Sequence, residues 1–223
     1  MPEQFQFLIV NAPERLRRSG LGLYGEKMDA TRTATAADAG CVIVPAVGRD
    51  RAQELLSLAR AKSPRVLLEV ASAAQAAMAG ELGFDGVVAT APVTSPVPVW
   101  GAGGIGLHSA AAWYAGGAAG VVLDAADPSW SGLAQRFRTV PAVVRGLRNA
   151  IRQHVELAKK HARLEPADGA AAPVITGLHD ADIEKLLADG VTHVVFSGIS
   201  DGRSAAMAAV LAAPLAEKGV RIG

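Results

Sequence analysis

The chain has 223 residues, half of them hydrophobic, and a formal net charge of +1. This balance gives no sign of an electrostatic surface for nucleic acid or membrane, and we expect neither as a partner. The apolar residues are mainly aliphatic, because only 4% of the chain is aromatic. The one cysteine, Cys41, excludes an intramolecular disulfide and fits a reducing compartment, so we expect a cytoplasmic protein.

Short apolar runs alternate with helical segments through the first 130 residues, which predicts βα units and a parallel sheet. Residues 14–24 are basic and interrupted by glycine, and they are predicted to be a loop. The expected strands are residues 5–10, 42–47, 66–70, 86–89, 97–100 and 121–124, and the expected helices are residues 29–39, 49–61 and 73–82.

The segment after residue 97 is the most informative part of the chain. An apolar run ends at Trp100, a glycine-rich turn spans residues 101–106, and an alanine-rich helix follows. Unpaired amides at a helix N-terminus favour an anion, so the turn can be interpreted as a phosphate site. The glycines alone are equally consistent with a tight turn that packs the helix closely against the strand.

The last third of the chain repeats the pattern of the earlier part. Residues 173–180, 181–189 and 193–196 have the character of strand, helix and strand, and Gly190 matches Gly83. This self-similarity indicates an internal duplication. The second copy is shorter, so we expect a deletion or an interruption between Phe196 and Ser197.

Three regions are therefore expected. Residues 1–130 would form a first barrel portion with the phosphate site. Residues 131–170 would be a helical segment, with a basic face interpreted as solvated rather than anion-binding, followed by a linker. Residues 171–223 would be the shortened second copy of the βα units.

Several motifs together resemble the nitronate monooxygenase (2-nitropropane dioxygenase-like) domains, most closely those fused into bacterial polyketide and polyunsaturated fatty acid synthases. The resemblance implies an α/β fold of the (β/α)8 TIM-barrel type that binds FMN. The segments that carry it are residues 67–72, 84–89, 98–112, 116–124, 200–207 and 216–223.

The resemblance also implies which residues contact the flavin. The phosphate would lie on the backbone amides of the first glycine turn and of a second turn near residue 200, and Asn11 would lie near the flavin ring. The residues concerned are Gly103, Gly104, Ile105, Gly106, Gly198, Ser200 and Gly202.

The histidines and Cys41 show no metal-ligand spacing, so no metal site is expected. His108 follows the first glycine turn and is interpreted as a capping or surface residue rather than a phosphate ligand. His179 is expected near a helix N-cap, and no catalytic residue is assigned.

Two functions remain open. The first is an FMN-dependent oxidoreductase of the nitronate monooxygenase or enoyl reductase type, acting on a small-molecule or acyl substrate, as a module beside other domains of a megasynthase. The second is a degenerate barrel with a structural or docking role. The glycine turn favours the first, whereas the absence of the family's histidine loop from residues 89–95 and the shortened second copy favour the second.

Overall fold

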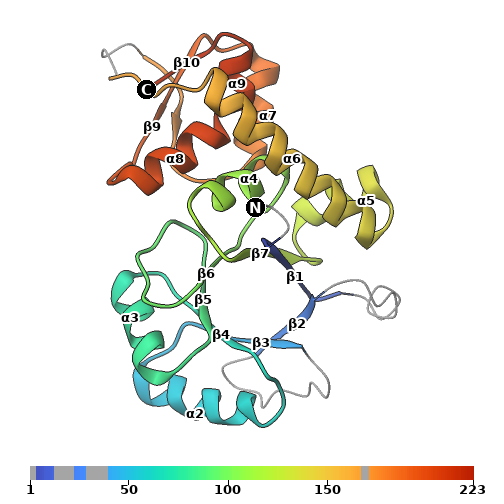
Figure 1. The fold of residues 1–223 in the computed structure, drawn as a ribbon, viewed down its shortest axis with the longest axis vertical. Coiled ribbons are helices and arrows are strands. Elements are labelled where there is room, and N and C mark those ends of the chain that lie inside the picture. Colours follow the sequence, from blue (N-terminus) through green and yellow to red (C-terminus); the bar gives the residue numbers. More distant parts are fainter. Residues whose placement is uncertain (1–3, 13–22, 29–39, 167–170) are drawn as a thin grey trace.

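The computed structural model describes residues 4–12, 23–28, 40–166 and 171–223. Within these residues seven parallel strands close into a barrel, because β7 pairs back onto β1 (Figure 1). The strands are β1 (Gln6–Val10), β2 (Leu23–Lys27), β3 (Cys41–Val44), β4 (Val66–Glu69), β5 (Gly86–Ala89), β6 (Val99–Gly101) and β7 (Gly120–Asp124). The expected α/β architecture with a parallel barrel is confirmed at this level.

The sequence prediction differs from the structure at one strand. Leu23 and Tyr24 were expected in a loop, but they begin β2, which lies between β1 and β3. The six strands predicted from apolar runs all correspond to observed strands, with boundaries that differ by up to three residues. The predicted helix at residues 29–39 lies outside the described residues.

Helices follow most of the strands. Ser72 begins α3 by accepting a hydrogen bond from the Gln75 amide at 3.3 Å, and Gly83 ends it at φ 85°. No helix in the described part of the chain has the length and apolar composition needed to cross a membrane. The helices are α2 (Arg49–Arg60), α3 (Ala73–Leu82), α4 (Leu107–Ala115), α5 (Pro128–Phe137), α6 (Val140–Lys160), α7 (Asp180–Asp189), α8 (Gly202–Leu211) and α9 (Ala213–Glu217).

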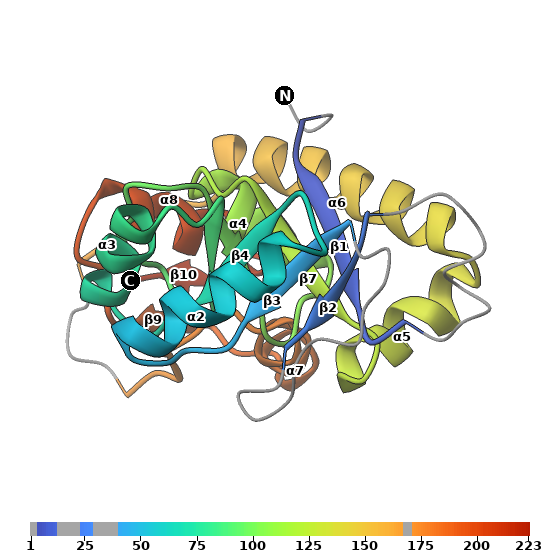
Figure 2. The same cartoon turned by 90° about the horizontal axis from the view of Figure 1, so that it is seen from below.

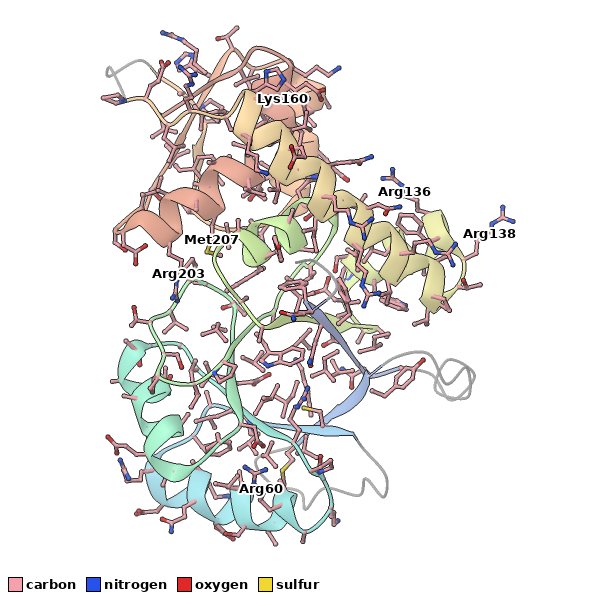
Figure 3. All side chains as sticks on the ribbon, in the orientation of Figure 1. Arg60, Arg136, Arg138, Lys160, Arg203 and Met207 are labelled. Atoms are coloured by element: carbon pink, nitrogen blue, oxygen red, sulfur yellow. The ribbon has the colours of Figure 1, made fainter. Side chains whose placement is uncertain are left out.

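The helical segment expected within residues 131–170 is two helices in the structure. Arg138 ends α5 in the left-handed region at φ 59°, and Thr139 then begins α6 by accepting from the Ala142 amide at 3.4 Å. Arg138 extends away from the rest of the molecule at the end of α5 (Figure 3), and Arg136 and Lys160 are also exposed, as expected for a solvated basic face.

The repeated part of the chain forms a second, separate parallel sheet. Its strands are β8 (Val174–Ile175), β9 (His193–Phe196) and β10 (Arg221–Ile222), in the order β10-β9-β8. After β9 the chain leads directly through residues 197–201 into α8, and α8 packs against α4 on the barrel side (Figure 2). Gly190 ends α7 at φ 64°, as Gly83 ends α3 in the first copy.

The barrel interior is filled by alternate residues of the strands. Leu8, Ile43, Leu67 and Trp100 belong to one buried cluster that is distinct from the layer between the strands and the helices. Cys41 lies in the same cluster, and burial raises the pKa of its thiol to about 12, so this side chain behaves as an inert, small hydrophobic group. A packed interior leaves the two ends of the barrel as the places for a site.

Candidate functional site

Charged side chains close the barrel interior at the C-terminal ends of the strands. Glu69 and Asp124 each end a strand two residues beyond a member of the interior cluster. Lys27 ends β2 two residues beyond Gly25, which lies directly against Leu8 of that cluster. The Lys27 ammonium lies 3.4 Å from a carboxylate oxygen of Glu69 and 3.4 Å from one of Asp124. Because β2 is next to neither β4 nor β7, these ion pairs must cross the mouth of the barrel.

Asn11 joins this layer from the end of β1. Its side-chain amide donates to Asp124 at 2.8 Å, and its backbone is in the left-handed region at φ 54°. Such a conformation costs free energy for a residue other than glycine and is common where a side chain must be aimed into a site. Asn11 therefore lies at the C-terminal face of the barrel, directly after the end of β1.

The first glycine turn follows β6 at the same face. Gly103 and Gly104 have φ values of 81° and 60°, Ile105 is buried, and Gly106 is the N-cap of α4. The Gly106 amide donates to the Ser109 hydroxyl at 2.9 Å. Among the described residues, no acceptor contacts the amides of Gly103 and Ile105.

Carboxylates of the chain itself already accept from the Gly104 amide and from two amides at the start of α4. Asp180 of α7 accepts from the amides of His108 and Ser109 at 2.9 and 2.7 Å, and from the Ser109 hydroxyl at 2.6 Å. Asp127, the N-cap of α5, accepts from the Gly104 amide at 3.4 Å. The hydrogen bond from the Ser129 hydroxyl holds the pKa of Asp127 below its usual value, so this carboxylate is charged at neutral pH.

The second glycine turn has the same local chemistry. Asp201 is the N-cap of α8 and accepts from the Ser204 amide at 2.7 Å, while the Ser204 hydroxyl accepts from the Ser200 amide at 3.0 Å. Ser204 thus corresponds to Ser109 in the first turn, although there the carboxylate comes from another helix. Gly198 has a φ of 78°, and Gly202 is the first residue of α8.

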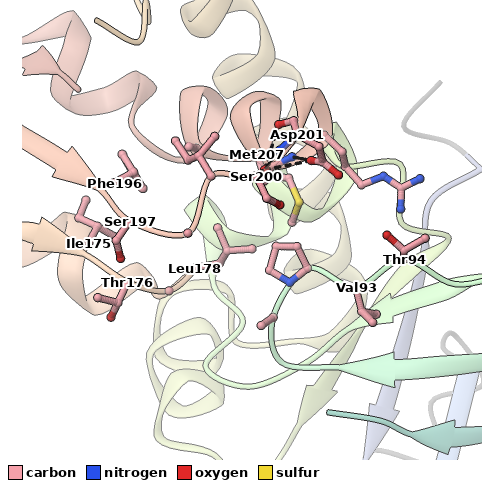
Figure 4. Close-up of a pocket in the computed structure, with 18 residues that line it drawn as sticks. Val93, Thr94, Ile175, Thr176, Leu178, Phe196, Ser197, Ser200, Asp201 and Met207 are labelled. Atoms are coloured by element: carbon pink, nitrogen blue, oxygen red, sulfur yellow. Dashed lines mark hydrogen bonds between the residues drawn. The ribbon is translucent and has the colours of Figure 1, made fainter. Parts of the chain in front are cut away.

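A cavity of about 270 Å³ lies beside the second turn. Figure 4 shows Val93 and Thr94, from the segment after β5, across from Ser200 and Asp201. Arg203 also lines the cavity, and it lies on the side of α8 that faces the barrel (Figure 3). Residues 103–106 are not among its lining residues, so the structure does not bring the two predicted phosphate turns into one cavity.

The histidine after the first turn, His108, is half-buried and pairs with the buried His154. His108 Nδ1 lies 2.7 Å from His154 Nε2, and His154 Nδ1 lies 2.7 Å from the carbonyl oxygen of Ala150. Burial lowers the pKa of His154, which is only 7% exposed. His179 is the N-cap of α7, as expected, without a side-chain capping bond.

Comparison with known proteins assigns no family. No protein-family model and no curated protein matches the chain. One matching solved structure is a cube-shaped, highly porous protein cage designed by fusing symmetric oligomeric domains. It is 15% identical, has a TM-score of 0.45, and the match covers 70% of this chain and 77% of that one. At this level of similarity we transfer neither fold nor function from it.

Proposed function

We propose that the protein is an FMN-dependent oxidoreductase of the nitronate monooxygenase or enoyl reductase type, with its site at the C-terminal mouth of the barrel. The observation that carries the proposal is the polar layer of Lys27, Glu69, Asp124 and Asn11 over an otherwise apolar interior. The three charged side chains are 25–39% exposed and pair with one another at the mouth of the barrel, which is the face where parallel βα barrels carry their functional sites.

The first glycine turn offers two backbone amides to the phosphate of FMN. The amides of Gly103 and Ile105 have no acceptor among the described residues, and they directly follow the end of β6. The amides of His108 and Ser109 are held by Asp180, so they are not assigned to the phosphate. The Gly104 amide would contribute only if the carboxylate of Asp127 moved aside.

The flavin, when bound, would supply the redox chemistry, while the chain would bind, orient and polarise it. Lys27 offers a positive charge at the barrel mouth, and Glu69 and Asp124 hold its ammonium in place. Asn11 fixes Asp124 through its side-chain amide. The (β/α)8 barrel type, the acyl or small-molecule substrate, the megasynthase partners and the cytoplasmic location remain parts of this proposal, since they rest on the resemblance and the composition.

Gly104→Val is expected to weaken FMN binding at least tenfold. A β-branched residue is strongly disfavoured at φ 60°, so the turn should rearrange and withdraw its amides from the phosphate. Gly117→Val is the matched control, because Gly117 has a φ of 75°, with open space around its Cβ position, beyond the other end of α4. Titration followed by quenching of flavin fluorescence measures both variants, and equal affinities would remove the turn from the site.

Asp127→Asn should tighten FMN binding about fivefold. The change removes a negative charge beside the Gly104 amide, an effect of about 1 kcal/mol for a solvated pair of charges. Asparagine is as good an N-cap as aspartate, so α5 should be retained. Asp182→Asn controls for a general loss of negative charge. The same titration would contradict the proposed phosphate position if Asp127→Asn bound FMN more weakly than wild type.

One observation favours the second candidate, a structural or docking domain. Both glycine turns are closed in part by carboxylates of the chain, from Asp180 at one and Asp201 at the other. Failure of the wild-type protein to bind FMN at any concentration in the titration would support this candidate and exclude the first.

A further inference from the structure

His108, Asp180 and Glu184 form a cluster whose ligand atoms all lie within 4.8 Å of one another. His108 lies in the first turn of α4, and the two carboxylates lie four residues apart on α7, which places them on one face of that helix. We propose that this cluster is a binding site for one divalent first-row transition-metal ion such as Zn²⁺ or Co²⁺.

The histidine pair prepares His108 as a ligand. The carbonyl oxygen of Ala150 can only accept, so His154 Nδ1 carries a hydrogen. Because the hydrogen on Nδ1 of His154 is used by Ala150, Nε2 of this ring is the acceptor in the pair, and the hydrogen between the two rings belongs to His108 Nδ1. The remaining lone pair of His108 is therefore on Nε2. A metal-binding histidine is usually fixed in this way, with its other nitrogen donating to a neighbouring group.

Asp180 is held in place by the start of α4. Its two oxygens accept from the His108 amide, the Ser109 amide and the Ser109 hydroxyl. A ligand fixed by three donors loses little freedom when a metal binds, and oxygen Oδ2, which accepts one of these bonds, keeps a lone pair.

Glu184 completes the set and is exposed. Two carboxylates four residues apart on a helix repel each other, which destabilises the helix. A cation bound between them would remove this repulsion. Ligand atoms around a metal at 2.0–2.2 Å lie about 3.4 Å apart. The ligand atoms of the cluster are up to 4.8 Å apart, so a small movement must bring them closer together around the ion. The exposed Glu184 side chain can make this movement by rotating.

The two carboxylates also line a cavity of about 610 Å³ between α5 and α7. Asp127 and Asp182 add negative charge to its wall, and Arg136 and His179 are the basic groups there. The net negative lining favours a cation, and the open space leaves room for water on the remaining coordination positions. One imidazole with two carboxylates suits a first-row transition ion better than calcium or magnesium, which prefer oxygen ligands alone.

The test is a Co²⁺ titration of the full, tag-free chain after treatment with EDTA, followed by visible absorbance and by melting temperature. We expect saturation at one ion per chain and a rise in melting temperature with ion concentration. Glu184→Gln should weaken binding at least tenfold without destabilising the metal-free protein, since Glu184 is exposed. His108→Gln should weaken it to a similar extent.

Two control variants keep the result interpretable. Asp182→Asn changes a carboxylate of the same helix and cavity that lies outside the cluster. His161→Gln changes an exposed histidine at the end of α6. Both should bind Co²⁺ within threefold of wild type. The site is disproved if wild type shows no saturable uptake, if Glu184→Gln binds as wild type does, or if His161→Gln causes the larger loss.

Discussion

Gly101→Ala is expected to lower the free energy of unfolding by about 3 kcal/mol, a large part of the ~5–15 kcal/mol that typically stabilises a folded protein. Gly101 ends β6, and a Cβ atom there would overlap the indole ring of Trp113 on α4. Both residues are buried, and Trp113 is only 2% exposed. A rigid ring in a packed core cannot move aside, so the strand and helix must separate. Urea unfolding followed by circular dichroism measures the loss.

A second substitution tests the cause. In Gly101→Ala combined with Trp113→Leu, the new methyl group has space, so the combined loss should be smaller than the sum of the single losses by at least 1 kcal/mol. Gly132→Ala, in α5 with open space around it, should be neutral or slightly stabilising. Strict additivity of the double variant would show that the contact with Trp113 is not the reason for glycine at position 101.

Asp180→Ala is expected to cost about 3 kcal/mol of unfolding free energy and to lower the melting temperature by about 6–12 °C. The substitution leaves the amides of His108 and Ser109 and the Ser109 hydroxyl without their acceptor, in a partly buried place. Each hydrogen bond to a charged group contributes about 1.5–3 kcal/mol, and water recovers part of the total. Differential scanning calorimetry of the metal-free protein measures the effect.

Two variants at the same end of α7 separate this contact from a general charge effect. Asp182→Ala removes a carboxylate from the same helical turn and should cost about 0.5 kcal/mol. Asp180→Asn keeps one acceptor oxygen, so its loss of unfolding free energy should lie between the losses of Asp180→Ala and Asp182→Ala. If Asp180→Ala and Asp182→Ala were equally stable, the bridge from α7 to the start of α4 would contribute nothing to the fold.

Most of the barrel could be predicted from the sequence because its strands are buried on both faces and consist of apolar runs. β2 was missed because its sequence, Leu-Tyr-Gly-Glu-Lys, is not such a run. Only its neighbours β1 and β3 define it as a strand, through backbone pairing that the sequence does not display. The number of strands in the barrel also depends on these pairings. In the described residues the barrel closes with seven strands.

The site could be predicted where it follows directly from a strand or a turn. Asn11 and the first glycine turn are at the mouth because each follows the end of a parallel strand. Glu69 and Asp124 were overlooked, although a charged residue that ends an apolar strand at an inward position was a usable signal. The contact of Asp180 with the start of α4 could not be foreseen, because it joins segments 72 residues apart through helix packing.

Closure of the barrel by β1 and β7 has a consequence for the synthesis of the protein on the ribosome. Gln6 of β1 pairs with Gly120 of β7, so this pair of strands can form only after Gly120 has been synthesised. At a synthesis rate of about 5–20 residues per second, one edge of β1 stays without its partner for on the order of ten seconds. During that time Phe7, Leu8 and Ile9, all buried in the finished barrel, are available to other nascent chains. The short apolar strand β1 therefore leaves the ribosome well before β7, which covers one of its edges, and the growing chain is open to aggregation during that interval.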